Sequence, residues 1–382
     1  MELTERAWAL EKELAALREQ LHCCPERGNR EFETARLIEQ VLQSCGIRTV
    51  RLTETGVMGV LEGAHPGKTV CLRADMDALP ICEETGVAFA SQNEGVMHAC
   101  GHDIHVTAAL GAARLLAECK EQLCGTVRFL FQPDEEEDGG AERMIAAGCM
   151  DGADAVFGAH VCPDLPLGTV GIRYGKFYAA ADKPDITVQG KSCHGATPEN
   201  GIDALYAAAL LAARLKELPD RFPDDGFVCT VGQMNAGTAR NIVAGQAELN
   251  CILRTLGPDT RKRIQTAIYD AAAEIESKTR ARITVRITEG YPGIVNEDGV
   301  TALAEKTAQR VFGTEKTIRI DTPTMTTEDF GYYQMKAPGC FYHLGVGGKE
   351  PLHSARFLPD SKAAVYGALM HASVIKAFLT KD

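Results

Sequence analysis

Short apolar runs rich in β-branched and aromatic residues alternate with helical patterns in the first 180 residues of the chain. The run KTVCL leads into Asp75 and Asp77, GTVRFLF leads into Glu135 and Glu136, and ADAVFGA leads into His160. Strands that alternate with helices predict a largely parallel sheet with helices on both faces. Ligand sites in such sheets lie beyond the carboxyl ends of the strands. These acidic residues and His160 are therefore expected to share one site.

The length and the order of the patterns predict two domains. A chain of 382 residues is too long for one ordinary hydrophobic core. From about Ala180 the pattern reads strand, helix, strand, strand, helix, strand, which is the order of a ferredoxin-like domain. After EGYPGIVNE the first pattern returns. We expect an α/β domain with a mixed sheet, in two parts at 1–179 and 290–382, and an α+β domain inserted at 180–289.

Helices of the first domain are expected where apolar residues recur at helical spacing. A stripe from Trp8 to Leu21 predicts a first helix capped by Thr4. The other expected helices are 32–44, 106–119, 141–147, 300–312 and 361–379.

Composition excludes several classes of protein. The net charge of −12 argues against a nucleic-acid partner, which requires basic patches. The start of the chain lacks the apolar core of a signal peptide, and no run of about 18 apolar residues predicts a membrane span. The 14 cysteines form no CxxC pair, so we expect reduced thiols in a cytoplasmic protein.

The segment MHACGHDIHVTAALGAARLLAECK places Cys100, His102 and His105 within six residues. It can be a metal site, a redox thiol, or a helix start that holds polar residues. Taken alone, it favours a buried cysteine and a histidine that caps the following helix.

More distant residues supply what a hydrolytic metal site needs, namely further ligands and a general base beside an open position. If Glu136 ligates a metal, its neighbour Glu135 is free to take a proton from water. The alternative is a solvated acidic loop. His160 at a strand end and His353 in a glycine-containing loop each allow a structural reading as well. His194, in GKSCHGATPENG, suits a catalytic or a surface role equally.

Seven motifs in order carry a family resemblance. They are RADMDALP, HACGHD, FQPDEEEDGGAERMIAAG, GAHV, GKSCHGATPENGIDAL, MTTEDFGYY and PLHSARF. From about Arg27 to Ala377 the chain resembles the M20 peptidase/amidohydrolase family. The resemblance is strongest to its branch of aminoacylase-like, hippurate hydrolase-like and auxin-conjugate hydrolase-like enzymes.

The resemblance implies a zinc-peptidase-like fold with an inserted lid that dimerises, and a pair of divalent metal ions. The implied metal ligands are Cys100, His102, Glu136, His160 and His353. The general base of the family falls on Glu135. A thiolate ligand fits zinc best, with manganese, cobalt or nickel as alternatives.

Further roles follow from the same resemblance. Asp75 and Asp77 are expected to orient the metal ligands through hydrogen bonds, and His105 to have a supporting or packing role. On the inserted domain, His194 is expected to polarise the scissile carbonyl, in its own subunit or in the partner's. Asn241 and Arg254 match positions that bind the substrate, and Arg254 can hold a carboxylate through two hydrogen bonds.

Three departures from the family pattern stand out. Asp134 occupies a position where the family often has a small residue, and its carboxylate adds charge beside the expected base. ATPENG replaces the more frequent AAxPHxG, so a second lid histidine is missing. RNIVAGQ replaces NVIPDxA, which weakens the assignment of Asn241.

The implied activity is hydrolysis of the amide bond of N-acyl amino acids, by a homodimer or homotetramer joined through the lid. Acetyl, benzoyl, succinyl and larger acyl groups all fit. The alternatives are a dipeptidase or aminopeptidase of the same family, a non-catalytic binding member, and a hydrolase that uses Cys100 as nucleophile.

Overall fold

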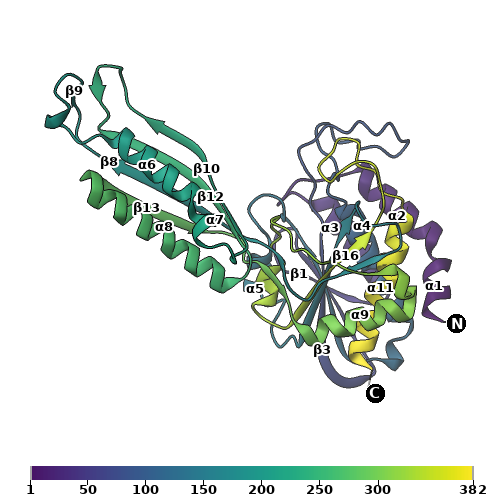
Figure 1. The fold of residues 1–382 in the computed structure, drawn as a ribbon. Coiled ribbons are helices and arrows are strands. Elements are labelled where there is room, and N and C mark those ends of the chain that lie inside the picture. The colour runs from purple at the N-terminus through teal and green to yellow at the C-terminus, as the bar shows by residue number, and fades with distance from the viewer. Residues whose placement is uncertain (1, 381–382) are drawn as a thin grey trace. The chain divides into compact units, whose positions relative to one another are not determined.

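The computed structural model describes residues 2–380, which form two compact units (Figure 1). The second unit consists of Lys176–Ile294 and Thr322–Glu328, and the remaining described residues form the first. The sequence pattern did not indicate that 322–328 joins the second unit. Backbone hydrogen bonds explain it, because Thr324 N–H donates to Phe177 O at 2.9 Å and Ala179 N–H donates to Thr326 O at 3.0 Å.

The first unit is built on an eight-stranded sheet with the order β1-β2-β4-β3-β5-β16-β6-β15. Its central strands β4, β3, β5 and β16 are parallel, whereas β1, β2 and β6 pair antiparallel with their inner neighbours. The predicted α/β class with a mixed sheet is confirmed. The strands are β1 (Arg48–Arg51), β2 (Val57–Glu62), β3 (His65–Asp75), β4 (Cys124–Gln132), β5 (Ala155–Cys162), β6 (Val170–Ile172), β15 (Thr317–Arg319) and β16 (Gly339–Gly345).

Helices cover both faces of this sheet. The helices are α1 (Leu3–Ala9), α2 (Glu11–Cys23), α3 (Phe32–Ser44), α4 (His102–Glu118), α5 (Ala141–Ala146), α9 (Asp298–Phe312), α10 (Gly331–Gln334) and α11 (Lys362–Leu379). Successive residues of β16 point to opposite faces of the sheet and contact the helices on each face. Tyr342 hydrogen-bonds His371 of α11 at 2.6 Å, while Phe341 packs on Phe330, which precedes α10. Short 3₁₀ turns are η1 (Lys120–Gln122), η2 (Pro198–Asn200) and η3 (Thr314–Lys316).

The N-terminal helix differs from the prediction. The stripe from Trp8 to Leu21 forms two helices, α1 and α2, that meet at Leu10. Thr4 lies inside α1, and Glu2 holds the cap position without a side-chain cap. The break keeps Leu14 and Leu21 buried against α4 and α11, so packing overrides the continuous helical pattern.

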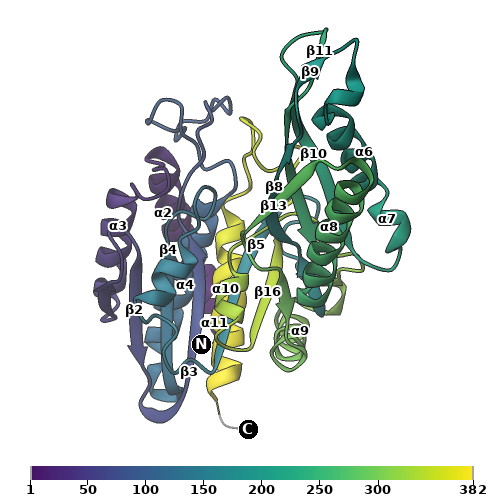
Figure 2. The same cartoon turned by 90° about the vertical axis from the view of Figure 1, so that its left-hand side faces the viewer.

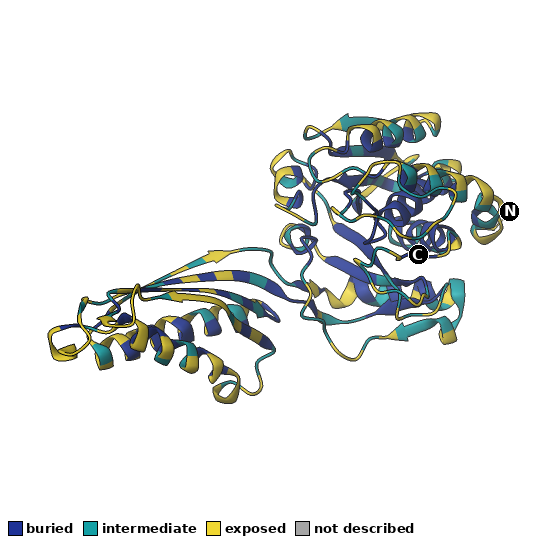
Figure 3. Ribbon diagram, turned by 90° about the horizontal axis from the view of Figure 1, so that it is seen from above, coloured by how far each residue is buried: buried dark blue, intermediate teal, exposed yellow. Residues whose placement is uncertain are grey.

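The second unit has a four-stranded antiparallel sheet with the order β10-β12-β8-β13. Its element order, β8-α6-β10-β12-α8-β13, is the ferredoxin-like order expected from the sequence. Helices α6 and α8 lie on one face of the sheet (Figure 2), and the strands alternate buried and exposed residues (Figure 3). The elements are β8 (Ala180–Gln189), α6 (Ala204–Lys216), α7 (Leu218–Arg221), β10 (Phe227–Ala236), β12 (Gln246–Thr255), α8 (Pro258–Thr279) and β13 (Arg282–Glu289), with a small pair β9 (Cys193–His194) and β11 (Ile242–Val243). Strands β7 (Gly175–Tyr178) and β14 (Ile294–Asn296) contain two of the points where the chain passes between the units, and the other two flank 322–328.

Across residues 2–380, no helix combines the length and the apolar character that crossing a membrane requires.

Helix α4 is buried on nearly all sides, which explains its Ala-rich, largely apolar sequence after the polar residues of its first turns. It approaches α11 closely because small residues lie where the two helices touch. A Cβ on Gly111 would lie 2.7 Å from Ala368 Cβ, and a Cβ on Gly367 would lie 2.7 Å from Ala108 Cβ. This packing holds in place the helix that begins at His102.

Gly111→Ala is therefore expected to destabilise the protein, although alanine favours a helix over glycine by about 1 kcal/mol. Overpacking of a rigid contact costs about 1–3 kcal/mol and should dominate in chemical denaturation. Ala368→Gly should relieve much of the loss when combined with Gly111→Ala. A single Gly111→Ala variant that is more stable than the wild type would contradict this packing.

Candidate metal centre

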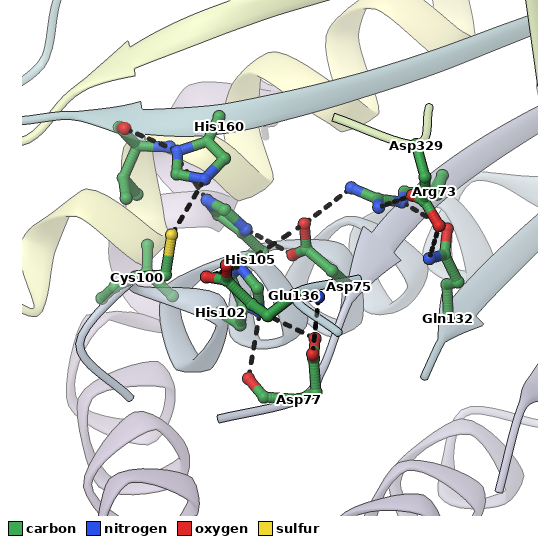
Figure 4. Close-up of polar contacts among 12 residues, drawn as sticks. Arg73, Asp75, Asp77, Cys100, His102, His105, Gln132, Glu136, His160 and Asp329 are labelled. Carbon is green, nitrogen blue, oxygen red and sulfur yellow. Dashed lines mark hydrogen bonds and ion pairs between the residues drawn. The ribbon is translucent and has the colours of Figure 1, made fainter. Parts of the chain in front are cut away.

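The expected site residues of the first unit meet at the carboxyl ends of the parallel strands (Figure 4). Asp75 ends β3, Glu135 and Glu136 follow β4, and His160 lies in β5. The loop after β16 adds His353, whose N–H donates to Ala99 O at 2.8 Å. Parallel strands bring these distant residues to one edge of the sheet, as the sequence pattern predicted.

Cys100 and His102 converge because of the turn between them. Gly101 has a φ of 83°, a left-handed conformation that glycine adopts without strain, and α4 begins immediately after it. Cys100 Sγ lies 3.3 Å from His160 Nε2. His160 Nδ1 donates to Val161 O at 2.8 Å, which leaves its Nε2 directed at the thiol.

Asp77 holds one neighbouring side chain and one neighbouring backbone N–H group. His102 Nδ1 donates to Asp77 O and Oδ1 at 3.0 and 3.1 Å, so His102 Nε2 is left as the free ligand atom. Glu136 N–H donates to Asp77 Oδ2 at 3.0 Å. His102 Nε2 and Glu136 Oε1 lie 3.9 Å apart, and both are buried without a hydrogen-bond partner among the described residues. Buried polar atoms of this kind require a partner, and a cation fits between an imidazole and a carboxylate.

Two ligand groups share one thiol. Cys100, His102 and His160 form one group and Cys100, Glu136 and His353 form another, with the ligand atoms of each group within 4.8 Å of one another. His353 Nε2 lies 3.3 Å from Glu136 Oε1. The five expected ligands are therefore together, in two groups that share Cys100 and could each hold a cation. Thiolate, imidazole and carboxylate donors suit zinc and its transition-metal neighbours.

A third group, Asp75, His102 and His105, has similar spacing but different hydrogen bonding. His105 Nδ1 donates to Asp75 Oδ1 at 2.5 Å, and His105 Nε2 accepts the Val161 N–H at 2.9 Å. Both ring nitrogens of His105 are thus engaged within the protein. Asp75 and His105 support the site and are not arranged as ligands.

Glu135 lies beside these groups without belonging to the pair of ligand groups that share Cys100. Its residue is only 7% exposed, and its carboxylate lies within 4.8 Å of ligand atoms of His102 and Glu136. A buried carboxylate next to a metal-ligating cluster is placed where a general base is needed.

The concentration of carboxylates governs the electrostatics. Burial opposes a charge on His102, but Asp75, Asp77 and Glu136 raise its pKa to about 10. Burial likewise disfavours the Glu136 anion, but His353 and His102 lower its pKa to about 2. Burial and the Glu136 and Glu135 carboxylates raise the pKa of the Cys100 thiol well above its usual value. The cluster therefore favours bound positive charge, and a cation in place of a proton would stabilise the Cys100 thiolate.

Asp134, the departure from the family pattern, is fully buried and has a φ of 58°. Its N–H donates to Glu31 Oε1 at 2.9 Å, and its Oδ2 accepts from Asn29 Nδ2 and Arg143 Nη2, both at 2.7 Å. Aspartate tolerates the left-handed conformation better than most residues. Gly28 leaves room for it, since a Cβ on Gly28 would lie 2.1 Å from Asp134 Oδ1.

Sequence reasoning missed a buried network beside the ligands. Arg73 donates to Asp75 Oδ2 at 2.6 Å, to Gln132 Oε1 at 2.9 Å and to Asp329 Oδ1 at 2.7 Å (Figure 4). Asp329 lies in the motif MTTEDFGYY, which carried the family resemblance without a role for this residue. The two adjacent acidic residues of that motif, Glu328 and Asp329, were the available signal, because the contact spans 256 positions.

The three expected substrate residues of the inserted domain belong to the second unit. His194 pairs with Ile242 in the small β9–β11 ribbon, where Gly195 N–H donates to Asn241 O at 2.7 Å, so His194 and Asn241 are neighbours. Arg254 lies on β12, and its Nη1 donates to Met325 O at 2.7 Å. Arg254 pairs with Ala181 at the start of β8, whereas His194 follows the end of β8, so Arg254 is not grouped with His194 and Asn241. The roles of all three residues toward a substrate stay predictions.

Glu31 gives a pH-dependent prediction. Burial raises its pKa to about 7 despite hydrogen bonds from Thr55 and Asp134. Because the folded pKa exceeds the ordinary value of 4.5, the native state binds more protons between these values. The favourable contribution is complete below about pH 4.5 and is lost as the pH rises through 7.

The glutamine of the Glu31→Gln variant cannot ionise, so this variant does not lose free energy of unfolding at position 31 as the pH rises. Its stability relative to wild type should rise from pH 5 to pH 8 by on the order of 1–3 kcal/mol, measured by urea denaturation. Glu33→Gln, at an exposed position, should show a difference that is flat with pH. A flat difference for Glu31→Gln would show that Glu31 is ionised throughout.

Comparison with known proteins identifies the family. The model of peptidase family M20/M25/M40 matches residues 71–377. An N-acetyl-L-cysteine deacetylase of Bacillus subtilis is 37% identical over 361 residues, covering 93% of this chain and 86% of the relative. Thermostable carboxypeptidase 1 of Saccharolobus solfataricus is 34% identical over 384 residues, covering 97% of each chain.

A solved structure agrees in fold. It is the YXEP protein of Bacillus subtilis, described as a dinuclear metal-binding peptidase from the M20 family. It matches this chain with a TM-score of 0.88 and 32% identity, over 97% of this chain and 99% of that one.

Proposed function

This chain belongs to peptidase family M20/M25/M40, and from this membership and its metal-ligating cluster we propose that it hydrolyses the amide bond of N-acyl amino acids. The observation that carries the proposal is the pair of ligand groups that share Cys100, with buried Glu135 beside them. A non-catalytic binding member would have no need to retain the ligands and the base together.

Two divalent cations fit the donor set. One is assigned to Cys100, His102 and His160, and the other to Cys100, Glu136 and His353. Bound cations of this type lower the pKa of water and polarise carbonyl groups. The thiolate favours zinc, with manganese, cobalt and nickel as alternatives.

Glu135 is assigned the proton transfers. Its carboxylate takes a proton from the attacking water as the water oxygen bonds to the acyl carbon. The same carboxyl group then gives the proton to the amine nitrogen as the C–N bond breaks. The products are a carboxylate and a free amino acid, and Glu135 is regenerated. Asp77 holds His102 and Glu136 in position during this exchange through its bonds to both.

The inserted domain is assigned substrate recognition and dimerisation. We assign His194 to polarisation of the scissile carbonyl, from its own subunit or its partner's, and Asn241 and Arg254 to the substrate's polar groups. Of these, Arg254 would have to exchange its bond to Met325 O for a substrate carboxylate. Homodimerisation through this domain is part of the proposal.

Two substrate classes have support among the relatives. The deacetylase relative favours a small acyl group such as acetyl. The carboxypeptidase relative favours a peptide, whose bond is also an amide of an amino acid. A hydrolysis screen of N-acetyl and N-benzoyl amino acids against dipeptides with a free amine separates these two classes.

Glu135→Gln should lower turnover of N-acetyl amino acids by about 10²- to 10⁴-fold, because the amide cannot accept the proton from water. Metal content, measured by plasma emission, should stay at the wild-type level. Glu137→Gln is the matched control, since Glu137 is exposed and pairs with Arg27 at the surface. Wild-type turnover in Glu135→Gln would remove Glu135 from the mechanism.

Chelation should abolish activity, and added zinc, manganese or cobalt should restore it.

Cys100→Ala should reduce the content of both metals together, because the two ligand groups share this thiol. Cys71→Ala, which removes another buried thiol from β3, should keep both metals. A metal-free protein that retains activity sensitive to thiol alkylation would indicate a cysteine nucleophile instead.

A further inference from the structure

We propose that Asp329 and Arg73 are positioning residues for the loop that carries Glu135 and Glu136. The inference rests on the proposed function for its catalytic consequence, but its structural part stands on contacts alone. Asp329 ties together the two ends of the loop, and Arg73 holds Asp329.

The loop between β4 and α5 covers residues 133–140, and the residues on either side of it donate to one oxygen atom. Gln132 Nε2, at the end of β4, donates to Asp329 Oδ2 at 2.7 Å. Ala141 N–H, at the start of α5, donates to the same oxygen at 3.1 Å. The Asp329 carboxylate thus links the two ends of the loop. Gln132, one of the two residues that it binds, lies three positions before Glu135, the proposed general base.

The loop also folds tightly at this closure. A Cβ on Gly140 would lie 1.8 Å from Pro133 O, so the two ends of the loop touch. Glycine at 140 permits this approach. The Asp329 carboxylate is therefore placed under a compact loop whose upper part holds Glu135 and Glu136.

Arg73 fixes the carboxylate itself. Its guanidinium, 1% exposed, bridges Asp329 Oδ1 and Asp75 Oδ2 and also donates to Gln132 Oε1. A buried guanidinium remains charged and has a rigid arrangement of donors. The side-chain amide of Gln132 is held from both sides, by Arg73 at its oxygen and by Asp329 at its nitrogen.

This arrangement matters for Glu135, because a ligand oxygen of Glu135 lies within 4.8 Å of one of Asp329. Two carboxylates at that separation repel each other unless one is compensated. Arg73 pairs with Asp329, so the general base lies next to a compensated ion pair. Loss of Asp329 would remove the tie between the two ends of the loop. Loss of Arg73 would leave the Asp329 carboxylate buried without this counter-ion.

The test uses Asp329→Asn in the full-length, metal-loaded enzyme. Hydrogen exchange of the amides in 133–140 should be at least about tenfold faster than in wild type, whatever the substrate. With N-acetyl amino acids, kcat should fall at least about tenfold, while KM and the content of both metals stay within about twofold of wild type. In a Glu135→Gln background, Asp329→Asn should have no further effect on residual kcat.

Glu305→Gln is the matched control, because Glu305 is a buried carboxylate that pairs with the exposed Arg319 in the same unit and outside the loop. It should lower thermal stability without faster exchange in 133–140 and without a change in kcat. If Asp329→Asn does not fold, Gln132→Met is judged by the same measurements, since it removes one tie and leaves the ion pair.

Unchanged exchange in 133–140 would overturn the inference even if the protein hydrolysed no N-acyl amino acid. Faster exchange with wild-type kcat would overturn the positioning role, provided that Glu135→Gln is inactive. Failure of the wild type to hydrolyse any amide would instead count against the proposed function, and the exchange measurement would still decide whether Asp329 ties the loop.

Discussion

Buried negative charge at the carboxyl ends of the central strands is the constraint on which the site depends. Asp75, Asp77, Glu135, Glu136 and Asp329 lie close together, and all but the partly exposed Glu136 are less than 9% exposed. Buried carboxylates are tolerated only when they are paired or coordinate metals. The sheet therefore has to supply positive charge and hydrogen-bond donors at the same edge.

Two kinds of group compensate this negative charge: the guanidinium of Arg73, and side chains that can bind a metal together with the carboxylates. Arg73 bridges Asp75 and Asp329 and so compensates both carboxylates without a metal. Glu135 and Glu136 lie with His102 in one group of candidate ligands, and Glu136 lies with Cys100 and His353 in another. Hydrogen bonds set His102 and His160 apart from His105. The Nδ1 atoms of His102 and His160 donate to backbone carbonyl groups, so their Nε2 atoms face Glu136 and Cys100, respectively. Both ring nitrogens of His105 are engaged within the protein.

Much of this was predictable from the sequence, because the strong local patterns agree with the tertiary structure. The apolar runs before Asp75, Glu135 and His160 form β3, β4 and β5, and the Ala-rich run after His102 forms α4. Local patterns could not show where packing divides a helix, as at Leu10. They also could not pair Arg73 with Asp329, because a contact across 256 positions leaves no periodic trace in the chain. The ligand set is a prediction from the motifs taken together, because each of its histidines alone allows a structural reading.

Asp134 shows how a departure from the family pattern can be accommodated beside such a site. A small residue there would leave the backbone free to choose its conformation, whereas aspartate holds the left-handed turn and ties it to Asn29 and Arg143. Its charge does not add uncompensated repulsion, because Arg143 pairs with it and burial raises the pKa of both Asp134 and neighbouring Glu31. The loop that carries Glu135 is then held from two directions, by Asp134 within the loop and by Asp329 at its base. Two independent ties on a loop of eight residues restrict the motion of its backbone. This restriction is what a general base needs in order to meet one water molecule in one orientation.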